Sequence, residues 1–401
     1  MRRFILASLA TSLIGVAGAA YAAPAPGIVG DFEVMTQNQY LGADIAPLIT
    51  AISDPVAFNT EIGNALMQIA ANKTPERIKS LAGQIIGRQP HLVGLQEVWK
   101  FSCIPAAAPP CTDPRIAGAF SDHLQLTEIA LGSSYAKAAL VQNFTVVSFT
   151  LPNGVVVPGI PFALDGLPFS GVPTGFLQVM DRDVIFARAG VKTTPYAYPC
   201  PPDPKTNVSN VSVDGCNYIA ALPLGPPLGS VKRGFVAVDA TDASGTQYRF
   251  VNTHLEVEAG GPIPPDVQYY QAAQLLQTVL QADPAPDSAR LFIVGDMNSS
   301  PNDPVVNNVP TPYMLFTASN LYDAWLIRPG NVAGLTCCQL EDLSNRASVL
   351  SRRVDLIFSR EMPRAVKDAR LIGAVASDRL APPGKGLWPS DHASVAAGLR
   401  Y

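Results

Sequence analysis

The sequence predicts a single mixed α/β domain in which β-hairpins are frequent. Three observations support this class: apolar runs of strand length recur along the chain, a few segments have helical periodicity, and several strand pairs are separated by short turns. Hairpins this frequent argue against a simple doubly wound parallel sheet. The 401 residues are 48% hydrophobic and 15% charged, which excludes a disordered or fibrous protein.

The predicted domain begins with a strand that is followed by helices. An apolar run from Phe32 indicates a strand that ends at Asn38, and two helical segments follow it. The second helix has Thr74 as its expected N-cap and Pro75 in the first helical position, and Gly87 is expected to end it. Its apolar stripe has the 3.6-residue period of a helix and comprises Ile78, Leu81, Ile85 and Ile86.

The other elements are apolar runs bounded by turn residues. We expect one hairpin about residues 152–154 and a second that pairs residues 234–240 with 247–255. An amphipathic helix is expected over residues 267–280. Further buried strands are expected over residues 91–96, 183–191, 291–296, 354–359 and 394–401. No internal repeat and no clear linker divides these elements, so they form one domain.

Residues 1–22 have the pattern of a secretory signal peptide. Two arginines precede the apolar run Phe4–Val16, and Ala20 and Ala22 occupy the small-residue positions of a cleavage site. The alternative is a membrane anchor, but the run is shorter than the roughly 20 apolar residues that a membrane span requires. Cleavage near Ala22 would make the protein secreted or periplasmic, with residues 30–401 as its folded domain.

In an oxidising compartment cysteines can pair, and four of the six in this chain are expected to form two local disulfides. Two cysteine pairs each bracket a Pro-rich loop: Cys103 with Cys111, and Cys200 with Cys216. Cys337 and Cys338 are adjacent, and the sequence leaves open whether they pair with each other, pair elsewhere or stay free. A zinc site is disfavoured because no C-x-x-C spacing or histidine cluster accompanies these cysteines.

Polar side chains stand at the ends of the predicted strands. Asp296 and Asn298 are two residues apart, so in extended backbone they share a face. Carboxylate and amide oxygens are ligands that Mg²⁺ prefers, and rigid strand ends can hold them in place. Two of the four histidines fall among these strand ends. The full set is Asn38, Glu97, His254, Asp296, Asn298, Asp355, Asp391 and His392.

The motifs around these residues resemble those of a known superfamily. VMTQNQYLG, GLQEV, NTHLE, GDMNSSP, RRVDLIF and SDH occur in this order between Val34 and Ala393. Together they resemble the endonuclease/exonuclease/phosphatase superfamily, with the deoxyribonuclease-I-like fold, in a secreted bacterial form. The resemblance implies a four-layer α/β sandwich, with two mixed β-sheets packed face to face and helices outside. It also implies hydrolysis of a phosphoester with Mg²⁺, or alternatively Mn²⁺, as cofactor.

The resemblance implies three residues on the metal side of the site. Glu97 is similar to the family's principal metal ligand, Asn38 to the asparagine beside the metal and phosphate, and Asp391 to the carboxylate before the last histidine. This chain departs from some members at Tyr40, where they carry an acidic residue. That difference argues against a second metal site and against activity at apurinic sites.

The other five residues are implied to be catalytic. Asp296 would activate or align the attacking water, and Asn298 would bind phosphate or metal. His254 is similar to a histidine that contacts the phosphate and acts as an acid. His392 would contact the scissile phosphate, with Asp355 orienting its ring.

Some of these residues also have ordinary structural interpretations. Asp355 lies two residues after Arg353, and the two could form a salt bridge without any catalytic role. Asp296 would also begin an Asx-turn before Pro301. His91 and His123 lie outside the motifs and are expected to be structural or surface residues.

Charge and hydropathy bear on the substrate. The formal net charge is −4 and no run of Lys or Arg occurs, which disfavours nucleic acid. The apolar segment 144–180 would either contact a membrane peripherally or pack as an ordinary hairpin on a sheet edge. A lipid headgroup, as in a sphingomyelinase, or another small phosphoester is therefore slightly favoured over an extracellular nuclease substrate. A non-catalytic phospho-ligand binding protein is the alternative of another class, and no obligate protein partner is visible.

Overall fold

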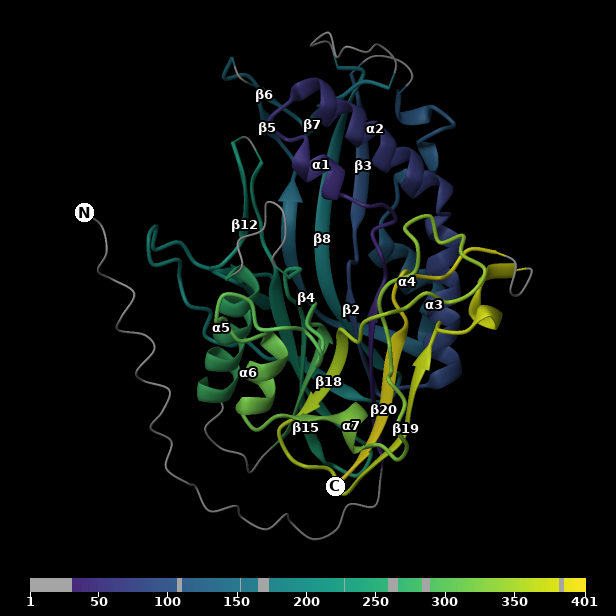
Figure 1. Ribbon diagram of the computed structural model, residues 1–401, viewed down its shortest axis with the longest axis vertical. Helices are drawn as coiled ribbons and strands as arrows, with labels where there is room; N and C mark the ends of the chain where they lie inside the picture. Colours follow the sequence, from purple (N-terminus) through teal and green to yellow (C-terminus); the bar gives the residue numbers. More distant parts are fainter. Residues whose placement is uncertain are drawn as a thin grey trace.

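The computed structural model of the chain (Figure 1) describes residues 31–106, 110–151, 153–164, 173–226, 228–258, 266–282, 289–381 and 386–401. The predicted signal peptide at residues 1–22 lies outside the described residues. Among the described residues, no helix combines the length and hydropathy that crossing a bilayer requires.

The first large sheet is mixed and has eight strands in the described part of the chain. Its main order is β19 (Ala365–Ile372), β20 (Ser394–Arg400), β1 (Phe32–Asn38), β2 (Leu92–Gln96), β8 (Gly175–Arg188) and β3 (Lys100–Pro105). Two further strands pair with β8: β4 (Tyr135–Val146) and β7 (Ile160–Phe162). The β1–β2 pair is parallel, so these two strands end at the same edge of the sheet.

The second sheet is also mixed and eight-stranded in the described residues. Its main order is β10 (Val211–Ser212), β11 (Gly215–Asn217), β14 (Gly234–Thr241), β15 (Gln247–His254), β16 (Arg290–Asp296), β18 (Asp355–Ser359) and β17 (Tyr322–Asp323), and β9 (Lys192–Pro195) pairs with β14. β15 and β16 run parallel. Two small hairpins stand apart: β12 (Leu222–Gly225) with β13 (Gly229–Val231), and β5 (Phe149–Thr150) with β6 (Val156–Val157).

The two sheets pack face to face with helices on the outside, as expected for a four-layer sandwich (Figure 1). Val34 and Leu92 of the first sheet share one buried cluster with Phe250 and Phe292 of the second, so this cluster fills the space between the sheets. The helices are α1 (Ala46–Thr50), α2 (Pro55–Ala71), α3 (Thr74–Arg88), α4 (His123–Leu131), α5 (Val267–Ala282), α6 (Pro312–Ala318) and α7 (Ala324–Ile327). Short 3₁₀ turns occur at Pro110–Thr112, Ala117–Ala119, Gly132–Ser134 and Ala376–Asp378.

Each outer face is covered by a separate apolar cluster. Ala82 and Ile85 of α3 pack with Leu95 and Phe186 on the outer side of the first sheet. Helices α5 and α6 cover the second sheet, where Leu275 joins a cluster of strand residues. The burial of both faces of each sheet explains why the central strands are almost uniformly apolar.

The boundaries of α3 differ from the sequence prediction. Thr74 is the first helical residue and is fully buried, whereas the N-cap position is occupied by Lys73 in a left-handed conformation with φ 51°. The helix continues through Gly87 and ends before Gln89, which has φ 59°. Gly87 is tolerated inside the helix, and a left-handed residue provides the stop that glycine was expected to supply.

Both predicted hairpins are present. Phe149 is opposite Val157 in the β5–β6 pair, although Pro152 at its turn lies outside the described residues. The second hairpin is β14–β15, paired over its full length. The sequence did not predict β4, because two register shifts interrupt the two-residue alternation that identifies a strand.

The cysteines form local disulfides. Cys103 is bonded to Cys111 and Cys200 to Cys216, which confirms both predicted pairs. The adjacent Cys337 and Cys338, which the sequence left open, are bonded to each other.

Candidate active site

The ends of β1, β2, β15 and β16 and the start of β18 bring predicted site residues to one edge of the sandwich. In the first sheet, Asn38 at the end of β1 lies beside Gln96, which directly precedes Glu97. In the second sheet, His254 is opposite Asp296, and Asp296 is opposite Asp355. The site is therefore assembled across both sheets by strand register.

Asn38 connects the carboxylates of the two sheets. Its Nδ2 donates to Oε1 of Glu97 at 3.1 Å and to Oδ2 of Asp296 at 3.0 Å. Its Oδ1 accepts from the backbone N–H of Tyr40 at 2.8 Å, while Oε2 of Glu97 accepts from the N–H of Leu41 at 2.7 Å. The amide is thus held with its nitrogen toward the carboxylates by the turn that follows β1.

His392 and Asp355 form a buried pair. Nδ1 of His392 lies 2.7 Å from Oδ2 of Asp355, and because a carboxylate only accepts, Nδ1 carries the proton between them. Nε2 of His392 lies 3.8 Å from Oδ2 of Asp296. Although burial alone would lower it, the pKa of His392 is raised well above its ordinary value by Asp355, Asp391 and Asp296. Arg353 binds Asp323 at 2.7 Å, so the alternative of an Arg353–Asp355 salt bridge is wrong.

His254 has different neighbours. Its Nε2 lies 3.5 Å from Oδ2 of Asp296 and 3.2 Å from Nδ2 of Asn298. Its Nδ1 lies 3.2 Å from Nη1 of Arg233. Burial and the positive charge of Arg233 lower the pKa of His254 to about 3. Asn298 is itself fixed, because its N–H donates to Oδ1 of Asp296 and its Nδ2 donates to the carbonyl of Leu255, both at 2.9 Å.

Asp391 lies on the loop before β20, and a buried arginine holds this loop. Burial and the nearby charge of Glu97 raise the pKa of Asp391 to about 7, even though His392 opposes this shift. Arg77 of α3 is fully buried and donates to the carbonyls of Tyr40 at 3.2 Å and Pro389 at 3.0 Å. The sequence analysis did not identify Arg77. The one sequence feature that marks it is its position as a charged residue on the apolar face of a helix.

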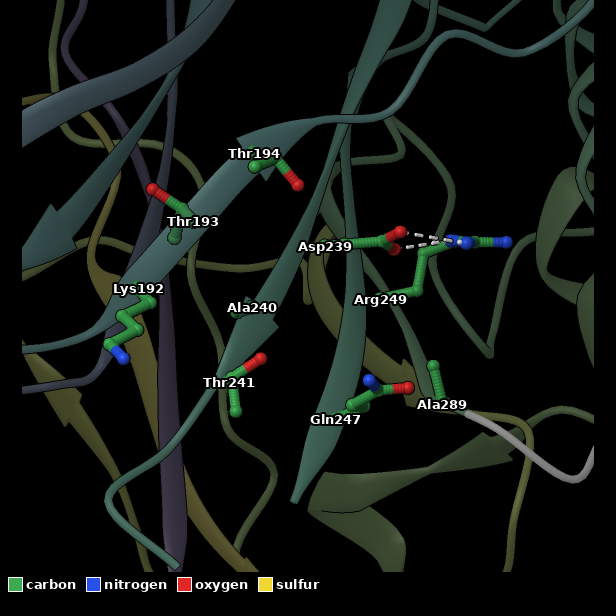
Figure 2. Close-up of a pocket in the computed structure, with 9 residues that line it drawn as sticks. All are labelled: Lys192, Thr193, Thr194, Asp239, Ala240, Thr241, Gln247, Arg249 and Ala289. Carbon is green, nitrogen blue, oxygen red and sulfur yellow. Dashed lines mark hydrogen bonds and ion pairs between the residues drawn. The ribbon is translucent and has the colours of Figure 1, made fainter. Parts of the chain in front are cut away.

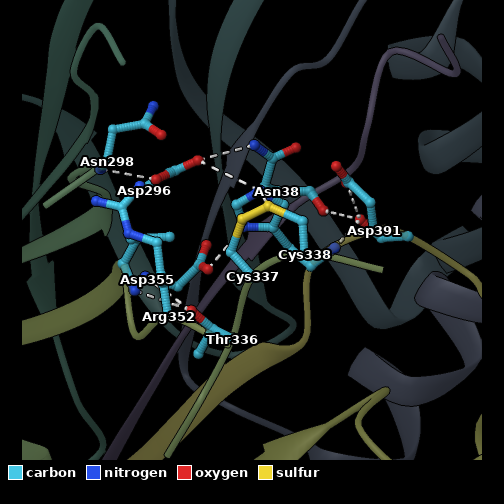
Figure 3. Close-up of a disulfide and its surroundings, with 12 residues drawn as sticks. Asn38, Asp296, Asn298, Thr336, Cys337, Cys338, Arg352, Asp355 and Asp391 are labelled. Atoms are coloured by element: carbon cyan, nitrogen blue, oxygen red, sulfur yellow. Dashed lines mark hydrogen bonds and ion pairs between the residues drawn. A yellow bond between two sulfur atoms is a disulfide. The ribbon is translucent and has the colours of Figure 1, made fainter. Parts of the chain in front are cut away.

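The segment that carries the adjacent cysteines lies beside Asp355 and Asp391 (Figure 3). Oγ1 of Thr336 accepts from the backbone N–H of Asp355 at 3.1 Å, and the carbonyl of Thr336 accepts from the N–H of Ala393 at 2.8 Å. Sγ of Cys338 lies 3.9 Å from Nε2 of His392. The sequence did not predict that this segment belongs to the site, because no strand-end pattern marks it.

The donor set fits a hard divalent cation. Glu97, Asp296 and Asp391 concentrate negative charge at one edge, and oxygen atoms dominate the groups that face each other there. A group of possible ligand atoms within 4.8 Å of one another comprises Asp296, Asp355 and His392, but the short Asp355–His392 hydrogen bond already occupies one atom of each. The described residues thus include acidic and histidine groups that could bind a divalent cation.

A cavity of about 280 Å³ lies at the other end of the second sheet (Figure 2). Gln247 lines it, and His254 of the same strand is seven residue steps away, or roughly 20 Å in extended backbone. Asp239 and Arg249 line it as well and bind each other at 2.8 Å. This distance separates the cavity from the candidate site.

Comparisons with known proteins are consistent with this architecture. A model of the endonuclease/exonuclease/phosphatase family matches residues 57–392. Among solved structures, the chain is similar to an endonuclease/exonuclease/phosphatase family protein from Leptotrichia buccalis, with 14% identity over 92% of this chain and 100% of that chain and a TM-score of 0.48. It is also similar to a mannosyl-6-phosphatase from Bacteroides thetaiotaomicron, with 13% identity over 92% of this chain and 100% of that chain and a TM-score of 0.47. A third similar structure is TDP2 from D. rerio complexed with single strand DNA product, with 16% identity over 92% of this chain and 99% of that chain and a TM-score of 0.45. No curated protein matches the sequence.

Proposed function

The chain belongs to the endonuclease/exonuclease/phosphatase family, and we propose that it is a secreted, Mg²⁺-dependent phosphoester hydrolase. One observation carries this proposal: Asn38 joins Glu97 and Asp296 across the two sheets, directly beside the His392–Asp355 pair. Hydrolysis of a phosphoester needs stabilised charge, an aligned water and a proton for the leaving group. This edge of the molecule offers candidates for all three.

The residues would divide these tasks by their chemistry. Glu97 and Asp391, with Asn38, would hold Mg²⁺, and a bound Mg²⁺ would neutralise charge on the nonbridging phosphate oxygens. Asp296 accepts hydrogen bonds from Asn38 and Asn298, which leaves its carboxylate oriented to align a water. His392, with its raised pKa and its ring held by Asp355, is the candidate proton donor.

An exposed apolar hairpin supports a lipid or other small phosphoester as substrate. Val147, Val155 and Val156 around β5 and β6 are 53%, 52% and 65% exposed. Exposed aliphatic side chains grouped in this way favour contact with an apolar surface, and the net charge of −4 gives no general attraction to nucleic acid. We therefore favour a headgroup phosphodiester, as in a sphingomyelinase, over an extracellular nucleic acid.

Export is part of the proposal. Residues 1–22 have the charge, length and cleavage pattern of a signal peptide. The three disulfides among the described residues suit an oxidising compartment, outside the cytosol of ordinary bacteria.

A substrate panel tests the function. The chain from Ala23 onward, supplied with Mg²⁺, would be assayed on sphingomyelin, phosphatidylinositol phosphates, DNA, RNA and p-nitrophenyl esters. We expect hydrolysis of a lipid or small phosphoester. Faster cleavage of DNA or RNA would replace the substrate assignment with a nuclease. Binding of a phosphorylated ligand without any turnover would favour a non-catalytic protein.

A further inference from the structure

The adjacent cysteines lie in a short segment, residues 336–339, that is bonded to the backbone on both sides of His392. The carbonyl of Thr336 accepts from the N–H of Ala393 at 2.8 Å, and the N–H of Gln339 donates to the carbonyl of Asp391, also at 2.8 Å. The two cysteines stand between Thr336 and Gln339, just as His392 stands between Asp391 and Ala393. The cysteine pair is therefore directly opposite His392 in this pairing.

The other edge of the same segment is bonded to the chain that leads into Asp355 (Figure 3). Cys337 forms an antiparallel bridge with Arg352: its N–H donates to the carbonyl of Arg352 at 3.0 Å, and its carbonyl accepts from the N–H of Arg352 at 2.9 Å. Oγ1 of Thr336 accepts from the N–H of Asp355 at 3.1 Å. The segment thus connects the backbones of both members of the buried histidine–aspartate pair.

We propose that the Cys337–Cys338 disulfide is a positioning unit for the His392–Asp355 pair, and that its reduction by a dithiol switches the site to a less active form. This inference deepens the proposed hydrolase function and rests on it for the effect on turnover. The effect of the disulfide on the backbone around the pair is a property of the folded chain and does not depend on turnover.

The disulfide restricts the backbone at the point where the segment lies opposite His392. A bond between the sulfurs of neighbouring residues closes a small ring, and this ring includes the backbone bonds between the two Cα atoms. Rotation about these bonds is limited while the ring is closed. When the ring opens, the two cysteines gain conformational freedom, so the hydrogen bonds of Thr336 and Gln339 to the residues beside His392 must hold a less ordered segment in place.

Cys338 lies where a reductant and a substrate would both reach it. It is exposed, whereas the other five cysteines of the chain are buried or half-buried. Its Sγ lies 3.9 Å from Nε2 of His392, which is the ring nitrogen that does not face Asp355. Cys338 therefore stands beside the nitrogen that would face a phosphoester, and its exposure leaves its disulfide open to attack by a thiolate.

The reduction is an ordinary thiol–disulfide exchange. A thiolate of the dithiol bonds to Sγ of Cys338, the bond between the two cysteine sulfurs breaks, and Cys337 leaves as a thiolate that takes up a proton. The second thiol of the reagent then attacks the mixed disulfide and releases Cys338, which is protonated in turn. The dithiol is oxidised to its cyclic disulfide, and the protein gains two electrons and two protons. Glutathione disulfide, which accepts these electrons and protons, restores the bond.

Hydrogen exchange tests the structural part of the proposal without any assay of turnover. Amide exchange would be followed by mass spectrometry in the wild-type chain, in the same chain after reduction, and in the ring-opened variant Cys337→Ser/Cys338→Ser. In both opened forms we expect faster exchange of the N–H groups of Asp355 and Ala393, because both donate to Thr336. Unchanged exchange of both amides in a folded, opened form would overturn the proposal.

The matched control opens a different disulfide. Cys103→Ser/Cys111→Ser removes the bond that joins β3 to the following loop, and β3 carries none of the candidate site residues. This variant should leave the exchange of the Asp355 and Ala393 amides unchanged. Equal acceleration in the control would show a general loosening of the fold and would overturn the positioning role.

Turnover of a p-nitrophenyl phosphoester provides the catalytic readout. The ring-opened variant should lower kcat about 10- to 100-fold with little change in KM, because a displaced proton donor slows the chemical step more than it weakens binding. Wild type treated with dithiothreitol should lose the same activity and regain it on reoxidation with glutathione disulfide, whereas the ring-opened variant should respond to neither reagent. Alkylation and peptide mapping identify the dithiothreitol concentration at which the Cys337–Cys338 bond alone is open. Full kcat in either opened form would overturn the proposal.

A His392→Ala background separates positioning from a general loss of structure. If the disulfide acts through His392, opening it should lower kcat by a much smaller factor in His392→Ala than in wild type. An equal factor in both backgrounds would show that the disulfide acts elsewhere and would overturn the inference. If the exchange result holds while no ester is hydrolysed, the hydrolase proposal fails and the positioning role of the disulfide stands.

Discussion

Nδ1 of His392 lies 2.7 Å from Oδ2 of Asp355, although 37 residues separate the two in sequence. Asp355 starts β18 and His392 lies two residues before β20, so the contact joins the two sheets at the candidate site. The carboxylate fixes which nitrogen of His392 faces the site, and it stabilises the charged imidazolium.

This relationship predicts unequal effects of two substitutions. His392→Ala should reduce turnover about 10²–10⁴-fold, because it removes the proposed proton donor. Asp355→Asn should cost less, since it keeps the imidazole and loses only its orientation and charge support. Steady-state kinetics and melting temperature would be measured on the same preparations. His91→Ala is the control, since the His91 ring accepts from the N–H of Glu33 away from the site, and an equal loss in this control would reject the assignment.

Metal dependence follows from the carboxylates at this edge. EDTA should abolish activity, and Mg²⁺ or Mn²⁺ should restore it, because oxygen atoms make up the candidate ligand set. Glu97→Gln should weaken Mg²⁺ binding by titration calorimetry as well as turnover. Glu76→Gln, a change at an exposed glutamate of α3, should affect neither. Full activity in EDTA would exclude the metal role.

The proximity of the eight candidate residues could be predicted because each stands at the end or the start of an apolar strand or in a recognisable motif. The register of the strands then brings them together, as the opposition of His254, Asp296 and Asp355 shows. Arg233 and Thr336 could not be predicted, because they act through contacts with residues distant in sequence and lie in no periodic pattern. The same limit explains why the sequence treats the two site histidines alike although their surroundings differ.

The burial of His123 should make the stability of the folded protein sensitive to acid. Burial and the charges of Arg77 and Arg182 lower its pKa to about 3. Below about pH 6.5, His123 therefore binds a proton in the unfolded chain but stays neutral in the folded chain. The stability that comes from keeping His123 neutral and buried is present above pH 6.5 and is lost as the pH falls toward 3. His123→Leu removes this term. The melting temperature of the variant relative to wild type should rise progressively between pH 6.5 and pH 4, and a constant difference would contradict the prediction.

The hydrogen bonds of Asn252 join the two sheets and should contribute to the stability of the fold. It is fully buried on β15, its Nδ2 donates to the carbonyls of Leu95 at 3.0 Å and Val184 at 3.2 Å, and its Oδ1 accepts from Nε2 of Gln96 at 2.6 Å. Asn252→Ala removes these three hydrogen bonds, and Nε2 of Gln96 keeps only its bond to Oγ1 of Thr36 at 3.1 Å. Each polar group left buried and unsatisfied costs about 1–3 kcal/mol. Urea unfolding should therefore show a large loss of stability.

Gly94 provides the second half of this test. A Cβ added at Gly94 would lie 2.4 Å from Oδ1 of Asn252, so Gly94→Ala must displace the amide and should also destabilise the protein. Removing the amide by Asn252→Ala removes most of that overlap, so Gly94→Ala should cost less in the Asn252→Ala background. The double-mutant cycle should give a coupling of about 0.5–3 kcal/mol, whereas additive effects would mean that the two residues do not interact. Gly87→Ala is the control, because nothing lies within 4 Å of its added Cβ, and in this helical position it should stabilise the fold by about 0.4–1 kcal/mol.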